Sequence, residues 1–202
     1  METRLSPDAV VPRHQDWLRW ELILLGLGAL GNPLHESGHW MVWTLRGIPA
    51  TMTFGQTRPL LDSGPGDFLV NAGGPFVNLA LAWIGVYLQY RSIPLLAQLG
   101  TGLTLVMAYG RLLVYLTVVL FGMSISRQDE GRMAHYLGWP MWSWVWVLGG
   151  LFLLTLVLTW RRTAGPAWQR GSIFLGALVV YGAVAGFEVL VLDTLLFDAR
   201  GP

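Results

Sequence analysis

The fold of this 202-residue chain is limited above all by its long apolar segments, which short polar stretches separate. A helix of about 20 apolar residues spans a bilayer. Only 12% of the residues are charged and 53% are hydrophobic, whereas soluble domains carry about a quarter charged residues. We therefore predict an all-α polytopic membrane protein with about five transmembrane helices, at residues 17–46, 68–90, 95–122, 141–160 and 172–196.

The composition also limits where in the cell the protein resides and which ligands a metal site could use. Residues 1–16 form a polar tail that contains Pro7 and Pro12, and no small-residue cleavage site follows it, so we predict no cleaved signal peptide. The net charge of +1 gives no indication of nucleic-acid binding. Cysteine is absent, so any metal site must use histidine and carboxylate ligands. The composition fits a multi-pass protein of a prokaryotic inner membrane.

Two polar stretches between the apolar segments have structure of their own. Residues 47–67 are rich in glycine and proline, and the alternating, β-branched pattern of 50–54 predicts a short strand there. Residues 126–138 hold the densest charged run and predict a re-entrant or interfacial helix. These boundaries divide the chain into a tail (1–16), a membrane core (17–138) and C-terminal transmembrane helices (139–202).

The segment His35-Glu36-Ser37-Gly38-His39 has the HExxH pattern of metal-binding helices. Residues four apart lie on one helix face, so His35 and His39 can bind one ion. Glu36 lies beside that ion and can accept a proton from water. The alternative is a pair of helical histidines satisfied by neighbours. Because three ionisable side chains at membrane depth cost a few kcal/mol each, we favour a metal site.

The helix that carries this motif contains an interruption. Gly31-Asn32-Pro33 precedes His35, and asparagine and proline are both common at helix starts. We therefore predict that the helix kinks or restarts here, which would place Glu36 near a helix N-terminus.

A catalytic zinc site takes three protein ligands and leaves one position for water. The third ligand must come from a distant segment of the chain. The candidates are the two remaining histidines and four carboxylates at plausible depth: His14, His135, Asp129, Glu130, Glu188 and Asp193.

Two motifs resemble the site-2 protease family of intramembrane zinc metalloproteases. The first is the HExxH segment with Gly38 before its second histidine, followed by Gly47-Ile48-Pro49. The second is Ala72-Gly73-Gly74-Pro75-Phe76-Val77-Asn78, which resembles the Gly-Pro-x-x-Asn element of the family. The resemblance covers about residues 20–90. The family's third motif, Asn-x-x-Pro-x-x-x-Leu-Asp-Gly, is absent, and Gln128-Asp129-Glu130-Gly131 is the nearest string.

The resemblance implies a role for each element. Zinc would be held by His35, His39 and Asp129, with Glu130 as the rival third ligand, and Glu36 would activate water. Asn78 would donate to the substrate backbone or the oxyanion. The remaining implied substrate-binding residues lie on the strand-like segment, which would pair with extended substrate, and in the glycine pair, which permits close approach of backbone: Thr51, Thr53, Gly73 and Gly74.

These observations favour a zinc-dependent intramembrane endopeptidase that cleaves transmembrane or membrane-proximal segments of protein substrates. The alternative is a catalytically inactive relative that serves as a structural or assembly subunit of a membrane complex. Partners would be a membrane-protein or peptide substrate and the lipid bilayer, and the sequence allows a homo-oligomer. A transporter is disfavoured because the chain is small and shows no inverted repeat.

Several residues have structural alternatives. Asn78 can form an interhelical hydrogen bond. The Asp129–Glu130 pair can be a solvated helix cap that pairs with nearby arginines. Arg111 and Glu188, both expected at membrane depth, predict a buried ion pair between the third and fifth spans.

Overall fold

The computed structural model describes residues 17–60 and 67–197, so the tail at 1–16 lies outside the described residues. The elements follow one another along the chain as α1 (Trp17–Leu45), β1 (Ala50–Met52), β2 (Thr57–Pro59), α2 (Phe68–Leu88), α3 (Pro94–Phe121), the 3₁₀ turn η3 (Ile125–Arg127), α4 (Asp129–Tyr136), α5 (Ser143–Arg162), α6 (Ala167–Phe187), the π-helical turn η4 (Glu188–Leu192) and α7 (Asp193–Leu196).

Four helices in the described ranges are long and apolar enough to cross a membrane. They are α2, α3, α5 and the continuous stretch Ala167–Leu196, which joins α6 to α7. The fifth long helix, α1, has 29 residues and carries the polar HExxH motif. This architecture confirms the prediction of an all-α polytopic membrane protein.

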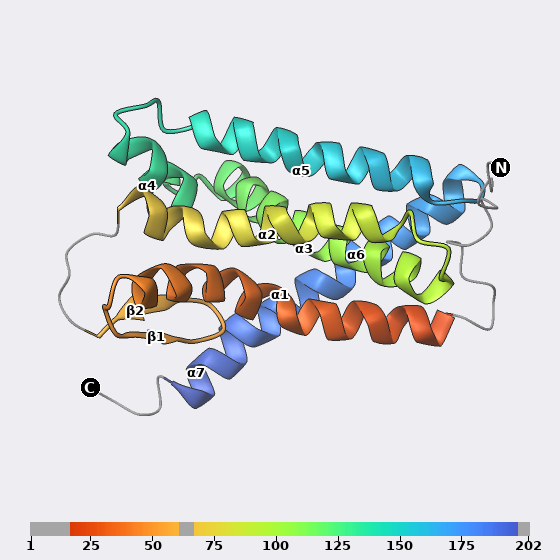
Figure 1. Cartoon of the computed structure of the whole chain (residues 1–202), viewed down its shortest axis with the longest axis horizontal. Coiled ribbons are helices and arrows are strands. Elements are labelled where there is room, and N and C mark those ends of the chain that lie inside the picture. The colour runs from red at the N-terminus through yellow and green to blue at the C-terminus, as the bar shows by residue number, and fades with distance from the viewer. Residues whose placement is uncertain (1–16, 61–66, 198–202) are drawn as a thin grey trace.

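The long helices form a bundle that a diagonal helix crosses (Figure 1). Helices α1, α2, α3 and α5 run along the long axis of the molecule. The α6–α7 stretch crosses them and ends beside the β1–β2 hairpin, while α4 lies at this same end. The main hydrophobic core draws buried side chains from all five long helices, including Trp20, Leu105, Phe152 and Ala177. Helices of the two predicted membrane regions, 17–138 and 139–202, thus share one core.

Helix α1 continues through Pro33 without a restart, so the predicted new helix N-terminus is wrong. A proline removes only one backbone donor from the helical ladder, and neighbouring helices stabilise such positions in membrane bundles. Consequently, Glu36 lies in a helix interior and gains nothing from a helix N-terminus.

The connection between α1 and α2 contains an antiparallel hairpin. Ala50 pairs with Pro59, Thr51 with Arg58 and Met52 with Thr57. The strand is therefore shorter than the predicted 50–54. Thr53 starts the turn instead, because its hydroxyl accepts a hydrogen bond from the Gln56 backbone N–H (3.2 Å).

The chain enters α2 through a capped start. The Asp67 carboxylate accepts a hydrogen bond from the Val70 backbone N–H (3.1 Å), which satisfies one of the free donors of the first turn. Arg46, just beyond the end of α1, pairs with the same carboxylate. Together, these contacts hold the ends of α1 and α2 against each other.

Candidate metal centre

Glycines allow α1 and α2 to approach closely enough to position the histidines. A Cβ atom on Gly38 would collide with the Gly73 backbone. A Cβ atom on Gly74 would lie 2.5 Å from Nε2 of both His35 and His39. The imidazoles therefore rest directly on the backbone of α2, a contact that only glycine permits.

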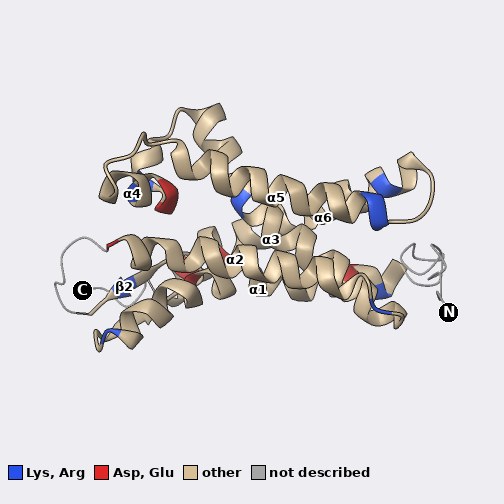
Figure 2. Cartoon of the chain, turned by 45° about the horizontal axis from the view of Figure 1, so that its top comes forward, with Lys and Arg blue, Asp and Glu red and all other residues tan. Residues whose placement is uncertain are grey.

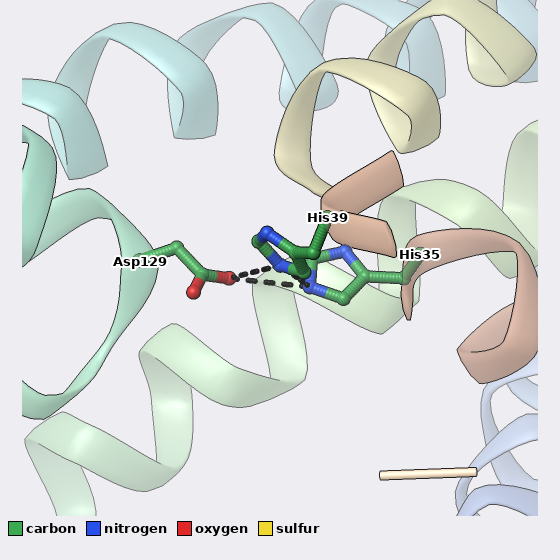
Figure 3. Close-up of side chains that lie close together, drawn as sticks. All are labelled: His35, His39 and Asp129. Atoms are coloured by element: carbon green, nitrogen blue, oxygen red, sulfur yellow. Dashed lines mark hydrogen bonds and ion pairs between the residues drawn. The ribbon is translucent and has the colours of Figure 1, made fainter. Parts of the chain in front are cut away.

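His35 and His39 on α1 lie next to Asp129 on α4, although about 90 residues separate them in the sequence (Figure 3). His35 Nε2 lies 3.2 Å from Asp129 Oδ2 and 3.2 Å from His39 Nε2. His39 Nε2 lies 3.4 Å from Asp129 Oδ2. All three side chains belong to a group whose ligand atoms can hold a metal ion.

The spacing of these atoms fits a tetrahedral ion. Zinc bonds to nitrogen and oxygen of about 2.0–2.1 Å place neighbouring donors about 3.3 Å apart. The observed edges of 3.2, 3.2 and 3.4 Å therefore match one face of such a tetrahedron. A tetrahedral ion has one further position beyond these three ligands.

Hydrogen bonding supplies the histidine form that a metal needs. His39 Nδ1 lies 2.6 Å from the Val70 carbonyl oxygen, which can only accept, so Nδ1 carries the proton and Nε2 keeps its lone pair. Arg111 Nη1 donates to His35 Nε2 (3.2 Å), which assigns the same form to His35. Three acceptor atoms thus face one another, and a cation bound between them would relieve their repulsion.

Asp129 lies at the start of α4, outside the membrane-spanning helices. Burial alone would raise the pKa of its carboxyl, but the charge of the neighbouring Arg111 guanidinium contributes to a pKa well below its usual range. The carboxylate is therefore ionised and able to bind a cation.

A buried ion-pair network next to Asp129 joins α3 to α4. Arg111 on α3 donates through Nε (3.1 Å) and Nη2 (2.7 Å) to Glu130 Oε1, and Tyr115 donates its hydroxyl to the same oxygen (2.7 Å). Nη1 lies 3.4 Å from Asp129 Oδ2. Glu130 is 0% exposed and lies outside the ligand group, so the solvated-cap alternative for these two acids is wrong.

The predicted pair of Arg111 with Glu188 is also wrong. Arg111 faces α4, where it pairs with Glu130 and Asp129. Glu188 instead accepts a hydrogen bond from Asn32 Nδ2 (3.2 Å). Hydropathy places Arg111 and Glu188 within apolar segments. It does not give the rotation of each helix about its axis, which decides which side chains meet.

The three ligand side chains line a polar cavity of about 570 Å³, together with Glu36 and Asn78. Glu36 is buried beside the histidines and is not part of the ligand group, and its role as a base stays a prediction. Asn78 Oδ1 is buried and has no hydrogen-bond partner among the described residues. The predicted alternative, an interhelical hydrogen bond of the Asn78 side chain, is therefore not met at this oxygen among the described residues.

The remaining predicted site residues lie near the cavity. Gly73 and Gly74 face α1 and its histidines, as described above. Thr51 is exposed on β1, with its hydroxyl 3.5 Å from the Arg58 carbonyl oxygen. The Thr53 hydroxyl donates to Asp193 Oδ2 (3.0 Å). The hairpin residues that line the cavity are instead the contiguous stretch Phe54–Pro59, and direct substrate contacts of the two threonines and two glycines stay predictions.

Sequence reasoning missed two parts of this site. The buried Arg111–Glu130–Tyr115 network carries one signal in the sequence, an arginine within an apolar segment, but its partner was assigned incorrectly. The α6–α7 stretch contributes Tyr181 and Val189 to the cavity wall, and neither residue was among the predicted site residues. No pattern in the C-terminal segment indicates that contribution.

Comparisons with known proteins do not assign this chain to a family. No protein-family model matches the chain, and neither curated proteins nor solved structures give a match. Any statement about function must therefore come from the site itself.

Proposed function

We propose that this protein is a zinc-dependent endopeptidase that cleaves transmembrane or membrane-proximal segments of other proteins, in a prokaryotic inner membrane. The observation that carries the proposal is the triangle of His35, His39 and Asp129 donor atoms, with the Glu36 carboxylate in the same polar cavity. Two histidines on one helix turn and a distant carboxylate are the ligand set of many catalytic zinc sites.

When bound, zinc would supply a Lewis acid and lower the pKa of water at its open position. The residues of the chain would do the rest. Glu36 takes the proton from the attacking water and delivers it to the leaving amine. The Asn78 amide nitrogen donates a hydrogen bond to the oxygen of the scissile carbonyl as negative charge develops on it.

The hairpin would present the substrate. A helical substrate hides its peptide bonds, so cleavage needs an extended stretch of chain. The β1–β2 sheet has only two strands and can be extended by a third strand from a substrate. Because hairpin residues Phe54–Pro59 line the cavity, a segment added to this sheet would pass close to the histidines.

Zinc content per polypeptide in detergent-purified protein tests the metal site. We expect about one zinc in the wild type, and loss of zinc in His39→Ala and Asp129→Ala. His135→Ala is the matched control, because this exposed histidine lies on the same short helix as Asp129. If the wild type takes up no zinc even after loading, the metalloprotease proposal fails and the structural-subunit alternative takes its place.

Glu36→Gln tests the chemistry separately from metal binding. This variant should keep its zinc and lose peptide cleavage, because only the base is removed. Cleavage of a transmembrane peptide in proteoliposomes is the measurement. Wild-type cleavage rates in Glu36→Gln would contradict the role of Glu36.

A further inference from the structure

Three arginines surround the cavity that contains the metal-ligand group. Arg58 comes from β2, Arg127 from η3 and Arg132 from α4, and all three are exposed and line the cavity. Figure 2 shows basic residues on β2 and on α4 at the same end of the molecule. We call Arg58, Arg127 and Arg132 the arginine rim.

The charge of the arginine rim is not neutralised within the described residues. Arg58 Nε donates to the neutral amide oxygen of Gln56 (3.0 Å). Arg127 and Arg132 form no ion pair with any acid in ranges 17–60 and 67–197. Exposed guanidinium groups that have no protein partner remain free to bind an anion.

The acidic groups that the structure describes at this end of the molecule have partners of their own. Asp67 pairs with Arg46, and Glu130 pairs with Arg111. Asp193 accepts hydrogen bonds from the hairpin, and Glu188 accepts one from Asn32. Among the described residues, Glu36 and Asp129 are the only acids that line the cavity, and a divalent ion bound there would balance their two charges. Counted over residues 17–60 and 67–197, the mouth of the cavity therefore keeps an excess of positive charge.

We propose that the arginine rim selects substrates with an acidic stretch next to the segment that is cleaved. This inference rests on the proposed peptidase function and names its substrate class. The rim lies on two sides of the cavity, on the hairpin and on the η3–α4 segment, so an extended peptide that crosses the cavity meets both. Arginine binds carboxylates through paired N–H donors, and the combined charge attracts an acidic chain before contact.

Peptide binding to the Glu36→Gln protein tests this proposal without any dependence on turnover. The probes are two fluorescent transmembrane peptides in bilayers of neutral lipid, one with four glutamates beside the membrane segment and one with four glutamines. The acidic peptide should bind roughly tenfold more tightly, since three exposed charge pairs each contribute a few-fold at most. That preference should shrink as salt is added.

The arginine rim is then replaced as a set. Arg58→Gln, Arg127→Gln and Arg132→Gln together should remove the preference and leave binding of the glutamine peptide unchanged. The control replaces the same number of charges at the opposite end of the bundle, with Arg91→Gln, Arg161→Gln and Arg170→Gln, and should keep the preference.

Two outcomes would overturn the proposal. One is equal binding of both peptides by the Glu36→Gln protein that keeps the rim. The other is a rim variant that keeps the acidic preference but loses binding to vesicles of anionic lipid, which would assign the arginines to lipid headgroups. Failure of the peptidase proposal would be visible elsewhere, as absence of zinc or as wild-type protein that cleaves neither peptide.

Discussion

Asp129 and Glu130 are neighbours in the sequence but face different partners. The Asp129 carboxylate faces the two imidazoles, whereas Glu130 is directed to Arg111 and Tyr115. Successive residues on a helix point about 100° apart, so one acid can face the metal site while the next anchors the arginine behind it. The choice between these two acids was open in the sequence, and only the orientation of α4 decides it.

Removing only one member of the Arg111–Glu130 pair should lower the stability of the protein more than removing both. Arg111→Met leaves the Glu130 carboxylate buried without a counter-charge, and such losses typically cost about 3–5 kcal/mol. Arg111→Met combined with Glu130→Met removes both charges and should recover most of that stability. Thermal unfolding in detergent measures the difference. A double variant that unfolds at the same temperature as the single variant would contradict this account.

Gly74 should be intolerant of even one added methyl group. In Gly74→Ala the new Cβ would lie 2.5 Å from both ligand nitrogens, so the imidazoles must move. We expect zinc affinity to fall roughly tenfold or more, as when groups that orient ligands are disturbed. Competition with a chromophoric chelator gives the affinity. Gly176→Ala is the control, since a Cβ there meets nothing within 4 Å, and an equal loss in both variants would refute the packing argument.

Among the elements, the limits of the long helices were the most predictable part of the fold, because hydropathy identifies where each apolar segment begins and ends. Hydropathy does not give the rotation of a helix about its axis or the hydrogen bonds that begin and end an element. The helix through Pro33 continues because its neighbours support it, and the predicted strand ends early because Thr53 caps a turn. The HExxH spacing already placed His35 and His39 on one face, but the approach of α4 to that face depends on tertiary packing.

The α6–α7 stretch holds the hairpin at its turn. The Asp193 carboxylate accepts hydrogen bonds from the backbone N–H groups of Phe54 (2.9 Å) and Gly55 (2.9 Å) and from the Thr53 hydroxyl (3.0 Å). These residues are nearly 140 positions apart in the sequence. The C-terminal helix therefore contributes to the position of the cavity wall.

Asp193→Ala should loosen this turn without unfolding the bundle. Charge-assisted hydrogen bonds contribute about 1.5–3 kcal/mol each, so amide exchange at Phe54 and Gly55 should accelerate about tenfold or more. Hydrogen–deuterium exchange measures this directly. Thr194→Val is the control, because its hydroxyl donates only to the Leu190 carbonyl within the same helix. Unchanged exchange at Phe54 and Gly55 in Asp193→Ala would show that the hairpin holds itself in place.

At the scale of the whole molecule, α1 connects the two ends of the bundle although it is less apolar than the other long helices. Its 29 residues extend about 44 Å, which exceeds the hydrocarbon thickness of about 30 Å. The polar side chains of its second half, His35, Glu36 and His39, are buried and line the cavity. They therefore avoid lipid, and we expect α1 to cross the membrane alongside α2 and α3.

Single-cysteine variants test this crossing cleanly, because the sequence contains no cysteine. Leu18→Cys and Leu45→Cys mark the two ends of α1, where the leucines are exposed. Ser92→Cys and Met123→Cys mark the two ends of α3. With a membrane-impermeant maleimide applied to oriented vesicles, Leu18→Cys should label from the same face as Ser92→Cys, and Leu45→Cys from the face of Met123→Cys.

Labelling of Leu18→Cys and Leu45→Cys from one common face would mean that α1 does not cross. The predicted result has a consequence for substrates, because the arginine rim lies at the end of the bundle that Leu45 and Met123 mark (Figure 1). An acidic stretch can reach the rim only from that face. Substrates should therefore carry their acidic residues on the side of the membrane where Leu45→Cys is labelled, and moving the four glutamates of the probe peptide to its other end should abolish its preferential binding.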